Sequence, residues 1–250
     1  MIEPEVSEEG AVKSFWEHLD DLRRMLFKCI AVLAVTFHLA LIFSNRILKF
    51  LAWPLRRATD HPENFLQSLN VTDSFVISLQ IALYVGLILA APLILYFVGQ
   101  FLLPALKPRE KKVLWPGFAA GTVLFVIGVA SCFFLVVPRT LQAFILASHW
   151  LGIEAHWTID SYISFITQFT LMMGLTFEAP LVVVILVRIG VLSYETVRRG
   201  RKIFVVVAFA IAAVLAPPDV LSMIYMALPL VLLFEVAIWL SWFADRKRRR

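Results

Sequence analysis

The stretch SFITQFTLMMGLTFEAPLVVVILV, residues 164–187, carries a single charged residue, Glu178, in a long apolar run. A run of this length is long enough to cross the roughly 30 Å hydrocarbon core of a bilayer as a helix. On such a helix the small and polar side chains recur at steps of three or four residues and share one face. They are Ser164, Thr167, Thr170, Gly174 and Glu178. The stretch therefore predicts a membrane span with one polar face.

Glu178 and Pro180 are the unusual residues of this span. Pro180 cannot donate a hydrogen bond to the carbonyl of Thr176, so we expect the helix to bend beside the carboxylate. An ionisable group inside a span is costly and marks a candidate functional site. The alternative is a protonated carboxyl that hydrogen-bonds a neighbouring helix and serves packing alone. The residues by themselves do not decide between the two.

The composition of the whole chain is also typical of a membrane protein. Of 250 residues, 60% are hydrophobic and 16% are charged, and the mean hydropathy is +0.84. The apolar residues come in long blocks, so we expect an all-α polytopic membrane protein that forms a single domain over residues 1–250.

Six blocks are long enough to be spans, and the last two are expected to be short. They are residues 25–43, 75–98, 115–137, 162–187, 203–216 and 220–243. Residues 1–13 are expected to be disordered, and 14–24 to form an amphipathic helix that a capping box of Ser14 and Glu17 begins. Short interfacial helices are expected in the loop 44–74, a second large loop at 138–160, and a basic tail at 244–250.

The basic residues predict the orientation. Arg46, Lys49, Arg56, Arg57 and Arg139 lie in loops on one side of the six spans, and the other 18 of the 23 Lys and Arg lie on the side of both termini. Because basic loops stay on the cytoplasmic side, both termini are expected there. The RKRRR ending at 246–250 is explained by this topology, so no nucleic-acid partner is expected.

Motifs for catalysis and for metal or cofactor binding are missing from the sequence. Cys29 and Cys132 lie in apolar runs without CxxC spacing, which is typical of inert buried thiols. The chain contains no HExxH, P-loop, Rossmann fingerprint or GxSxG with a placed histidine. We therefore predict no catalytic residues, no metal and no cofactor, and a protein that is not an enzyme.

Four motifs resemble the TatC family, the multispanning core of the twin-arginine protein translocase. They are HLDDLRR at 18–24, QFLLPALKPREKK at 100–112, SFITQFTLMMGLTFEAPL at 164–181 and APPDVLS at 216–222. The resemblance runs in order from Ser14 to Phe243. It implies a receptor in the bacterial cytoplasmic membrane that binds twin-arginine signal peptides of folded cargo. It also implies a multimeric complex with the single-span partners TatA and, usually, TatB.

The resemblance also assigns residues. Signal-peptide binding falls on Asp21, Arg23, Phe101, Pro104, Glu110 and Lys111. The intramembrane polar positions for partner docking are Thr170, Glu178, Pro180 and Glu235, and the positions on the far side are Pro54, Pro218 and Asp219. Asp21 departs from the glutamate that the family usually has, which leaves open whether Asp20 shares its role. Some relatives have glutamine where this chain has Met223.

Simpler interpretations remain beside these assignments. Glu235 could extend to the membrane interface, and Asp219 could serve as a helix N-cap after two prolines. Pro54 and Pro104 fit a role in shaping their loops. A proton- or ion-coupled secondary transporter in which Glu178 titrates is the alternative function, and it predicts pH-driven solute uptake by this chain alone.

Overall fold

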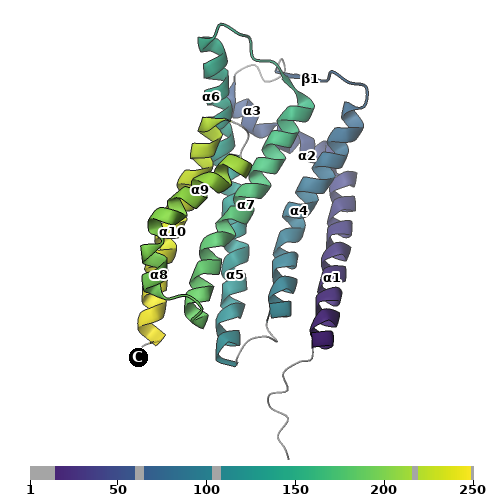
Figure 1. Ribbon diagram of the computed structural model, residues 1–250. Coiled ribbons are helices and arrows are strands. Elements are labelled where there is room, and N and C mark those ends of the chain that lie inside the picture. Colours follow the sequence, from purple (N-terminus) through teal and green to yellow (C-terminus); the bar gives the residue numbers. More distant parts are fainter. Residues whose placement is uncertain (1–14, 60–64, 103–107, 216–218, 249–250) are drawn as a thin grey trace, which may run out of the picture.

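Long helices make up most of the computed structural model, which describes residues 15–59, 65–102, 108–215 and 219–248 (Figure 1). Five described helical segments are long and apolar enough to cross a membrane. They involve α1 (Phe15–Ile42), α4 (Asp73–Leu102), α5 (Pro108–Ser131), α7 (Ile159–Ile189) and α10 (Val220–Arg248). The predicted class, an all-α polytopic membrane protein, is confirmed.

Helix α7 lies at the centre of the bundle. It packs against α4, α5 and α10, and α4 packs on its other side against α1. Figure 1 shows α1 beginning and α10 ending at the same end of the bundle, which we call the N-terminal end. Residues 15–24 are the first turns of α1 and continue directly into its apolar part. The expectations for residues 1–13 and for capping by Ser14 lie outside the described residues.

The third span continues much further than the sequence predicted. A π-helical turn, Cys132–Val136, follows α5 and leads directly into α6 (Val137–Trp150), so the expected loop at 138–160 is helical over most of its length. Pro138 directly follows the predicted end of the third span. In the structure it lies in the first turn of α6, where a proline is tolerated, and the Val137 N–H donates to the Cys132 carbonyl five residues back.

The last two spans differ in length. Helix α9 (Arg201–Leu215) has 15 residues, about 22 Å, and is as short as predicted. The same expectation is wrong for α10, which has 29 residues and an apolar part of 23 residues, about 34 Å. Pro229 lies inside α10 without ending it, and the helix continues to Arg248 through most of the basic tail.

Short elements close the opposite end of the bundle. Helices α2 (Ser44–Leu51) and α3 (Trp53–Ala58) confirm the short helices expected in the loop 44–74. Strands β1 (Leu66–Gln67) and β2 (Trp157–Thr158) pair in parallel and join this loop to the start of α7. Together with α6 these elements cap the bundle (Figure 1).

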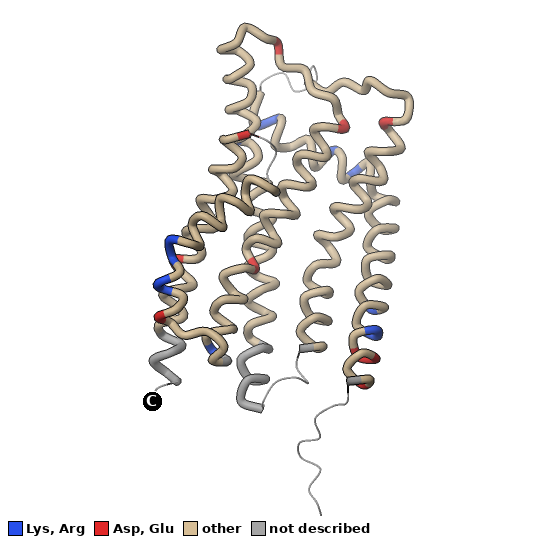
Figure 2. The backbone as a smooth tube through the Cα atoms, viewed as in Figure 1, with Lys and Arg blue, Asp and Glu red and all other residues tan. Residues whose placement is uncertain are grey.

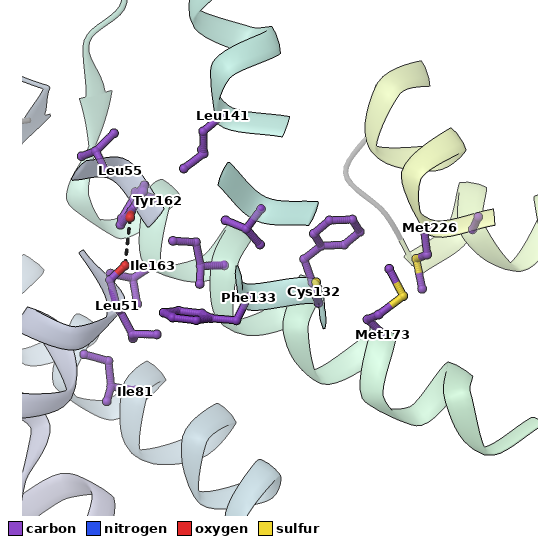
Figure 3. Close-up of a cluster of buried hydrophobic side chains, with 14 of the residues drawn as sticks. Leu51, Leu55, Ile81, Cys132, Phe133, Leu141, Tyr162, Ile163, Met173 and Met226 are labelled. Atoms are coloured by element: carbon purple, nitrogen blue, oxygen red, sulfur yellow. Dashed lines mark hydrogen bonds between the residues drawn. The ribbon is translucent and has the colours of Figure 1, made fainter. Parts of the chain in front are cut away.

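The largest buried cluster lies beneath this cap and joins α2 and α3 to α7 (Figure 3). The Tyr162 hydroxyl donates to the Leu51 carbonyl at 2.9 Å, and both residues are buried. Because a buried carbonyl without a donor carries a desolvation cost, this bond fixes the cap to α7.

Tyr162→Phe is expected to lower the free energy of unfolding by about 1–2 kcal/mol, because the Leu51 carbonyl loses its donor in an apolar cluster. The measurement is the melting temperature of the detergent-solubilised protein. Tyr225→Phe is the matched control, since Tyr225 is only half-buried on α10. Equal melting temperatures for the two variants would contradict the role of this bond.

Candidate functional site

Helices α1 and α4 enclose an open pocket of about 230 Å³ at the N-terminal end. Its lining is Asp21, Arg24, Met25 and Lys28 from α1, and Phe97, Gln100 and Phe101 from α4. The α1 residues recur at helical spacing, so one face of this helix carries a carboxylate and two cations toward the end of α4. The charged side chains of the pocket therefore come from α1, and its aromatic side chains come from α4.

The adjacent carboxylates Asp20 and Asp21 occupy different places. Asp20 pairs with Arg24 one turn along α1, with 3.0 Å between Oδ2 and Nη2, and both side chains are at least half exposed. Asp21 lines the pocket, and Asp20 does not. The geometry therefore makes Asp21 the carboxylate that a ligand in this pocket meets, while Asp20 acts on the pocket through Arg24.

Aromatic rings hold the cations and the pocket wall in place. His18 stacks on Phe101 with 4.6 Å between ring centroids, and Lys28 Nζ lies 5.7 Å from the centroid of Phe97. Arg23 instead lies over Phe27 of its own helix, 5.6 Å from the ring centroid, and does not line the pocket. Of the residues predicted for this site, the structure brings Asp21 and Phe101 together and leaves Arg23 beside them.

Two other residues predicted for this site lie at the start of α5. Glu110 and Lys111 are in the first turn of this helix, at the same end of the bundle as the pocket (Figure 1). Pro104 lies outside the described residues. The pocket and the start of α5 thus share the N-terminal end.

Glu178 lies in α7, well away from both ends of this helix. Figure 2 shows that the charged residues lie mostly near the ends of the described bundle and along its α8–α9 side, and that few lie among the central helices. The Glu178 side chain is half-buried against Gly121 of α5, and its Oε1 atom is buried without a hydrogen-bond partner among the described residues. This carboxylate can therefore accept a hydrogen bond from a group that lies outside the described residues.

The predicted polar face of α7 is an internal face. Ser164 donates to Gln80 of α4 at 3.2 Å, and Thr167 donates to the Ile163 carbonyl of its own helix at 2.7 Å. Thr170 is buried, and its hydroxyl has no partner among the described groups. Pro180 is buried as well, and α7 passes through it as one helix.

Glu235 has a partner within the chain. Its Oε2 atom lies 2.8 Å from Nη2 of Arg201, the first residue of α9, and both side chains are partly exposed. The ion pair connects α10 to α9, close to where Phe204 stacks on Phe234 with 3.6 Å between ring centroids. Glu235 is therefore engaged in holding two helices together.

The predicted residues of the opposite end have structural contacts. Pro54 is buried in the first turn of α3, which packs on α6. Asp219 Oδ1 accepts a hydrogen bond from the Ser222 N–H at 2.7 Å, so the N-cap interpretation of Asp219 is confirmed. Pro218 lies outside the described residues.

Several residues of these sites were not predicted from the sequence. Arg24, Lys28 and Phe97 line the pocket, and their helical spacing from Asp21 and Phe101 was a usable signal. Gln80 Nε2 donates to Asp160 Oδ1 at 2.7 Å and thereby joins α4 to α7. A polar residue inside the second apolar block was the only sign of this contact in the sequence.

Metal and disulfide chemistry finds no support in the part of the chain that the structure describes. Among the described residues, no three His, Cys, Asp or Glu side chains come together in a way that could hold a metal ion. Cys29 and Cys132 are free thiols, and Cys132 is fully buried.

These features define a class of protein, a polytopic α-helical membrane protein with a charged pocket at one end and a half-buried carboxylate within the bundle. The family model of the Sec-independent protein translocase protein, TatC, matches residues 17–229. The chain therefore belongs to the TatC family, a component of a protein translocase, and the resemblance inferred from its motifs is confirmed.

Individual relatives agree with this assignment. TatC of Aquifex aeolicus is 35% identical over 235 residues, which cover 93% of this chain and 96% of the relative. TatC of Escherichia coli K12 is 33% identical over 232 residues, 93% of this chain and 89% of the relative. TatC of Akkermansia muciniphila is 41% identical over 176 residues, and the match spans 70% of this chain and about half, 51%, of that protein.

Solved structures show the same fold. Two crystal structures of the twin arginine translocase receptor TatC, one of them in DDM, superpose with TM-scores of 0.78 and 0.80 at 34% identity. They cover 91% and 90% of this chain, and 99% of their own chains. The likeness therefore extends over the helices that carry the pocket and Glu178.

Proposed function

We propose that this chain is the receptor and core subunit of a twin-arginine translocase. In this role it binds twin-arginine signal peptides at the cytoplasmic face and recruits single-span partners, TatA and TatB, into a multimeric complex that exports folded proteins. The observation that carries the proposal is the α1–α4 pocket, in which Asp21 lies beside two aromatic side chains in a member of the TatC family.

The chemistry of this pocket suits an arginine side chain. A carboxylate can accept two parallel hydrogen bonds from one guanidinium, and aromatic rings favour a planar cation against their faces. Phe97 and Phe101 supply such rings next to Asp21. A lysine has no planar fork and would gain less at the same place.

A motif of two arginines requires a second acceptor. Glu110 in the first turn of α5 is the candidate, since α5 begins at the end of the bundle where the pocket lies. Two carboxylates on separate helices can each take one arginine. Lys28 and Arg24 line the pocket together with Asp21. We therefore expect them to repel a peptide whose positive charges do not meet Asp21 itself.

The partners are assigned to the intramembrane carboxylate. The Glu178 side chain is only half-buried, and a polar side chain in a single-span helix could donate to its carboxylate. Thr170 lies about two turns from Glu178 on α7 and is buried beside the Cys132 thiol. Glu235 is paired with Arg201, so we expect it to act on partners through the position of α9.

The proposed topology has six crossings in the bacterial cytoplasmic membrane with both termini in the cytoplasm. Helix α9 would be the short crossing, about 22 Å against roughly 30 Å of hydrocarbon. A short span favours local thinning of the bilayer, which would ease the passage of large cargo. The transporter alternative is not retained, because the relatives over nearly the whole chain are translocase proteins.

Complementation tests the function. The chain is expressed, with its own single-span partners, in a strain that lacks its core subunit, and export of a folded reporter behind a twin-arginine signal is measured. We expect export, and we expect none when both signal arginines are changed to lysine. A stably inserted chain that restores no export with either its own or the host's partners would contradict the proposal.

A further inference from the structure

Three glycines of α5 face α7, and two of them, Gly121 and Gly128, differ in the kind of atom they meet. A Cβ placed on Gly128 would lie 3.1 Å from the Gly174 Cα atom and 2.8 Å from the ring of Phe177, so backbone approaches backbone here. A Cβ placed on Gly121 would lie 2.8 Å from Glu178 Oε2 and 2.9 Å from Leu181 Cδ2. At Gly121 the missing side chain makes room for the end of a carboxylate.

This difference separates a packing role from a positioning role. Backbone atoms cannot move aside without separating two helices, whereas the end of a glutamate side chain can rotate to another rotamer at little cost. Gly128 therefore holds the α5–α7 interface together. Gly121 is not needed for that interface to form, and yet its neighbour is the buried carboxylate.

The carboxylate at this place has a polar atom to offer. Both oxygens lie against Gly121, with Oε2 at 2.8 Å and Oε1 at 3.4 Å from the placed Cβ atom, and only Oε1 is fully buried without a hydrogen-bond partner among the described residues. The side chain as a whole is half-buried, so part of it stays accessible beside the contact of α5 with α7. Exposed apolar residues of α7, such as Leu175 and Val182, border the same region.

We propose that Gly121 is a positioning residue that makes room for the Glu178 carboxylate between α5 and α7, so that the accessible part of this half-buried side chain meets a donor from a partner's single membrane helix. The inference rests on the proposed docking role of Glu178. An alanine at position 121 would displace the carboxylate by several tenths of an ångström or into another rotamer, and the donor would no longer meet it.

The test measures docking at Glu178 and folding separately. A photoreactive residue replaces Val182, one turn from Glu178, and the yield of crosslinks to a co-expressed TatA-type single-span protein is measured in membranes. For Gly121→Ala we expect the yield to fall about tenfold, as for loss of a hydrogen bond to a charged group. The melting temperature and the binding of a twin-arginine peptide at the α1–α4 pocket should stay as in the parent.

Gly117→Ala is the matched control, because its Cβ would meet only the Ile185 side chain, at 3.1 Å. We expect this variant to crosslink like the parent. A loss at position 117 equal to that at position 121 would overturn the inference.

Two second-site changes separate positioning from packing. Glu178→Asp shortens the side chain by one methylene and removes the clash with Ala at 121, so the double variant should recover crosslinking toward the level of Glu178→Asp alone. Leu181→Ala removes the other close contact of an alanine at position 121, and it should not restore the crosslinking that Gly121→Ala loses. Rescue by Leu181→Ala and not by Glu178→Asp would overturn the inference, because the defect would then be one of packing.

Crosslinking of Glu178 variants separates failure of the docking role from failure of the positioning role. If Glu178→Gln and Glu178→Ala both crosslink like the parent, the carboxylate has no part in docking. The docking role of Glu178 and the positioning role of Gly121 are then both wrong. If these variants lose crosslinking while Gly121→Ala keeps it, the docking role stands and the positioning role of Gly121 is wrong.

Discussion

Gly128→Leu is expected to leave almost no folded protein in the membrane. A Cβ at this position would already lie 3.1 Å from the Gly174 Cα atom, and leucine adds three further carbons. Overpacking a tight interface costs about 1–3 kcal/mol even where side chains can yield, and here the neighbour is backbone. Because α7 also contacts α4 and α10, displacing α5 from it disturbs the whole bundle.

The measurement is the yield of a monodisperse peak when a fluorescent fusion is extracted in mild detergent and run on a size-exclusion column. Val126→Leu is the control, since Val126 is exposed on the same helix and half a turn away. Gly128→Ala should give an intermediate yield. Equal yields for Gly128→Leu and Val126→Leu would show that the close approach of α5 and α7 is not needed for folding.

Asp21→Asn is expected to weaken binding of a twin-arginine peptide by about 10–100-fold, because truncating a charge-assisted contact costs about 1.5–3 kcal/mol. The substitution keeps the shape of the side chain and removes its charge. Lys28 and Arg24 then remain in the pocket without Asp21 to oppose them and repel the arginines. Fluorescence anisotropy of a labelled signal peptide on the chain in nanodiscs gives the affinity.

Asp20→Asn is the matched control for this variant. Asp20 pairs with Arg24 at 3.0 Å and does not line the pocket, so Asp20→Asn should weaken peptide binding only a few-fold. Asp21→Glu keeps the charge and restores the residue that the TatC family usually has, so it should bind at least as well as the parent. If Asp20→Asn and Asp21→Asn weaken the peptide equally, the assignment of Asp21 is wrong.

The membrane class and most of the helices could be predicted because long apolar runs leave few alternatives. The sequence could not show how far the third span continues. Pro138 is a helix-ending signal by local rules, and a π-helical turn at Cys132–Val136 accommodates it. Nor did the run of apolar residues reveal that α10 extends to Arg248, since a basic flank does not by itself end a helix.

The candidate sites were predictable to different degrees. Asp21 and Phe101 lie in motifs that resemble TatC, and the structure places them in one pocket. Arg24 and Lys28 follow Asp21 at helical spacing, so they could have been added from periodicity alone. The contact of Glu178 with Gly121 joins two residues more than fifty positions apart in sequence, and no local pattern indicates it.

Recognition of the two arginines of a signal peptide by this chain can be measured as one affinity ratio. The purified chain in nanodiscs is titrated with two labelled peptides that differ only in a twin-arginine or a twin-lysine core. We predict that the arginine peptide binds at least about tenfold more tightly, and that Asp21→Asn removes most of this preference. Equal affinities for the two peptides at physiological salt would contradict the account.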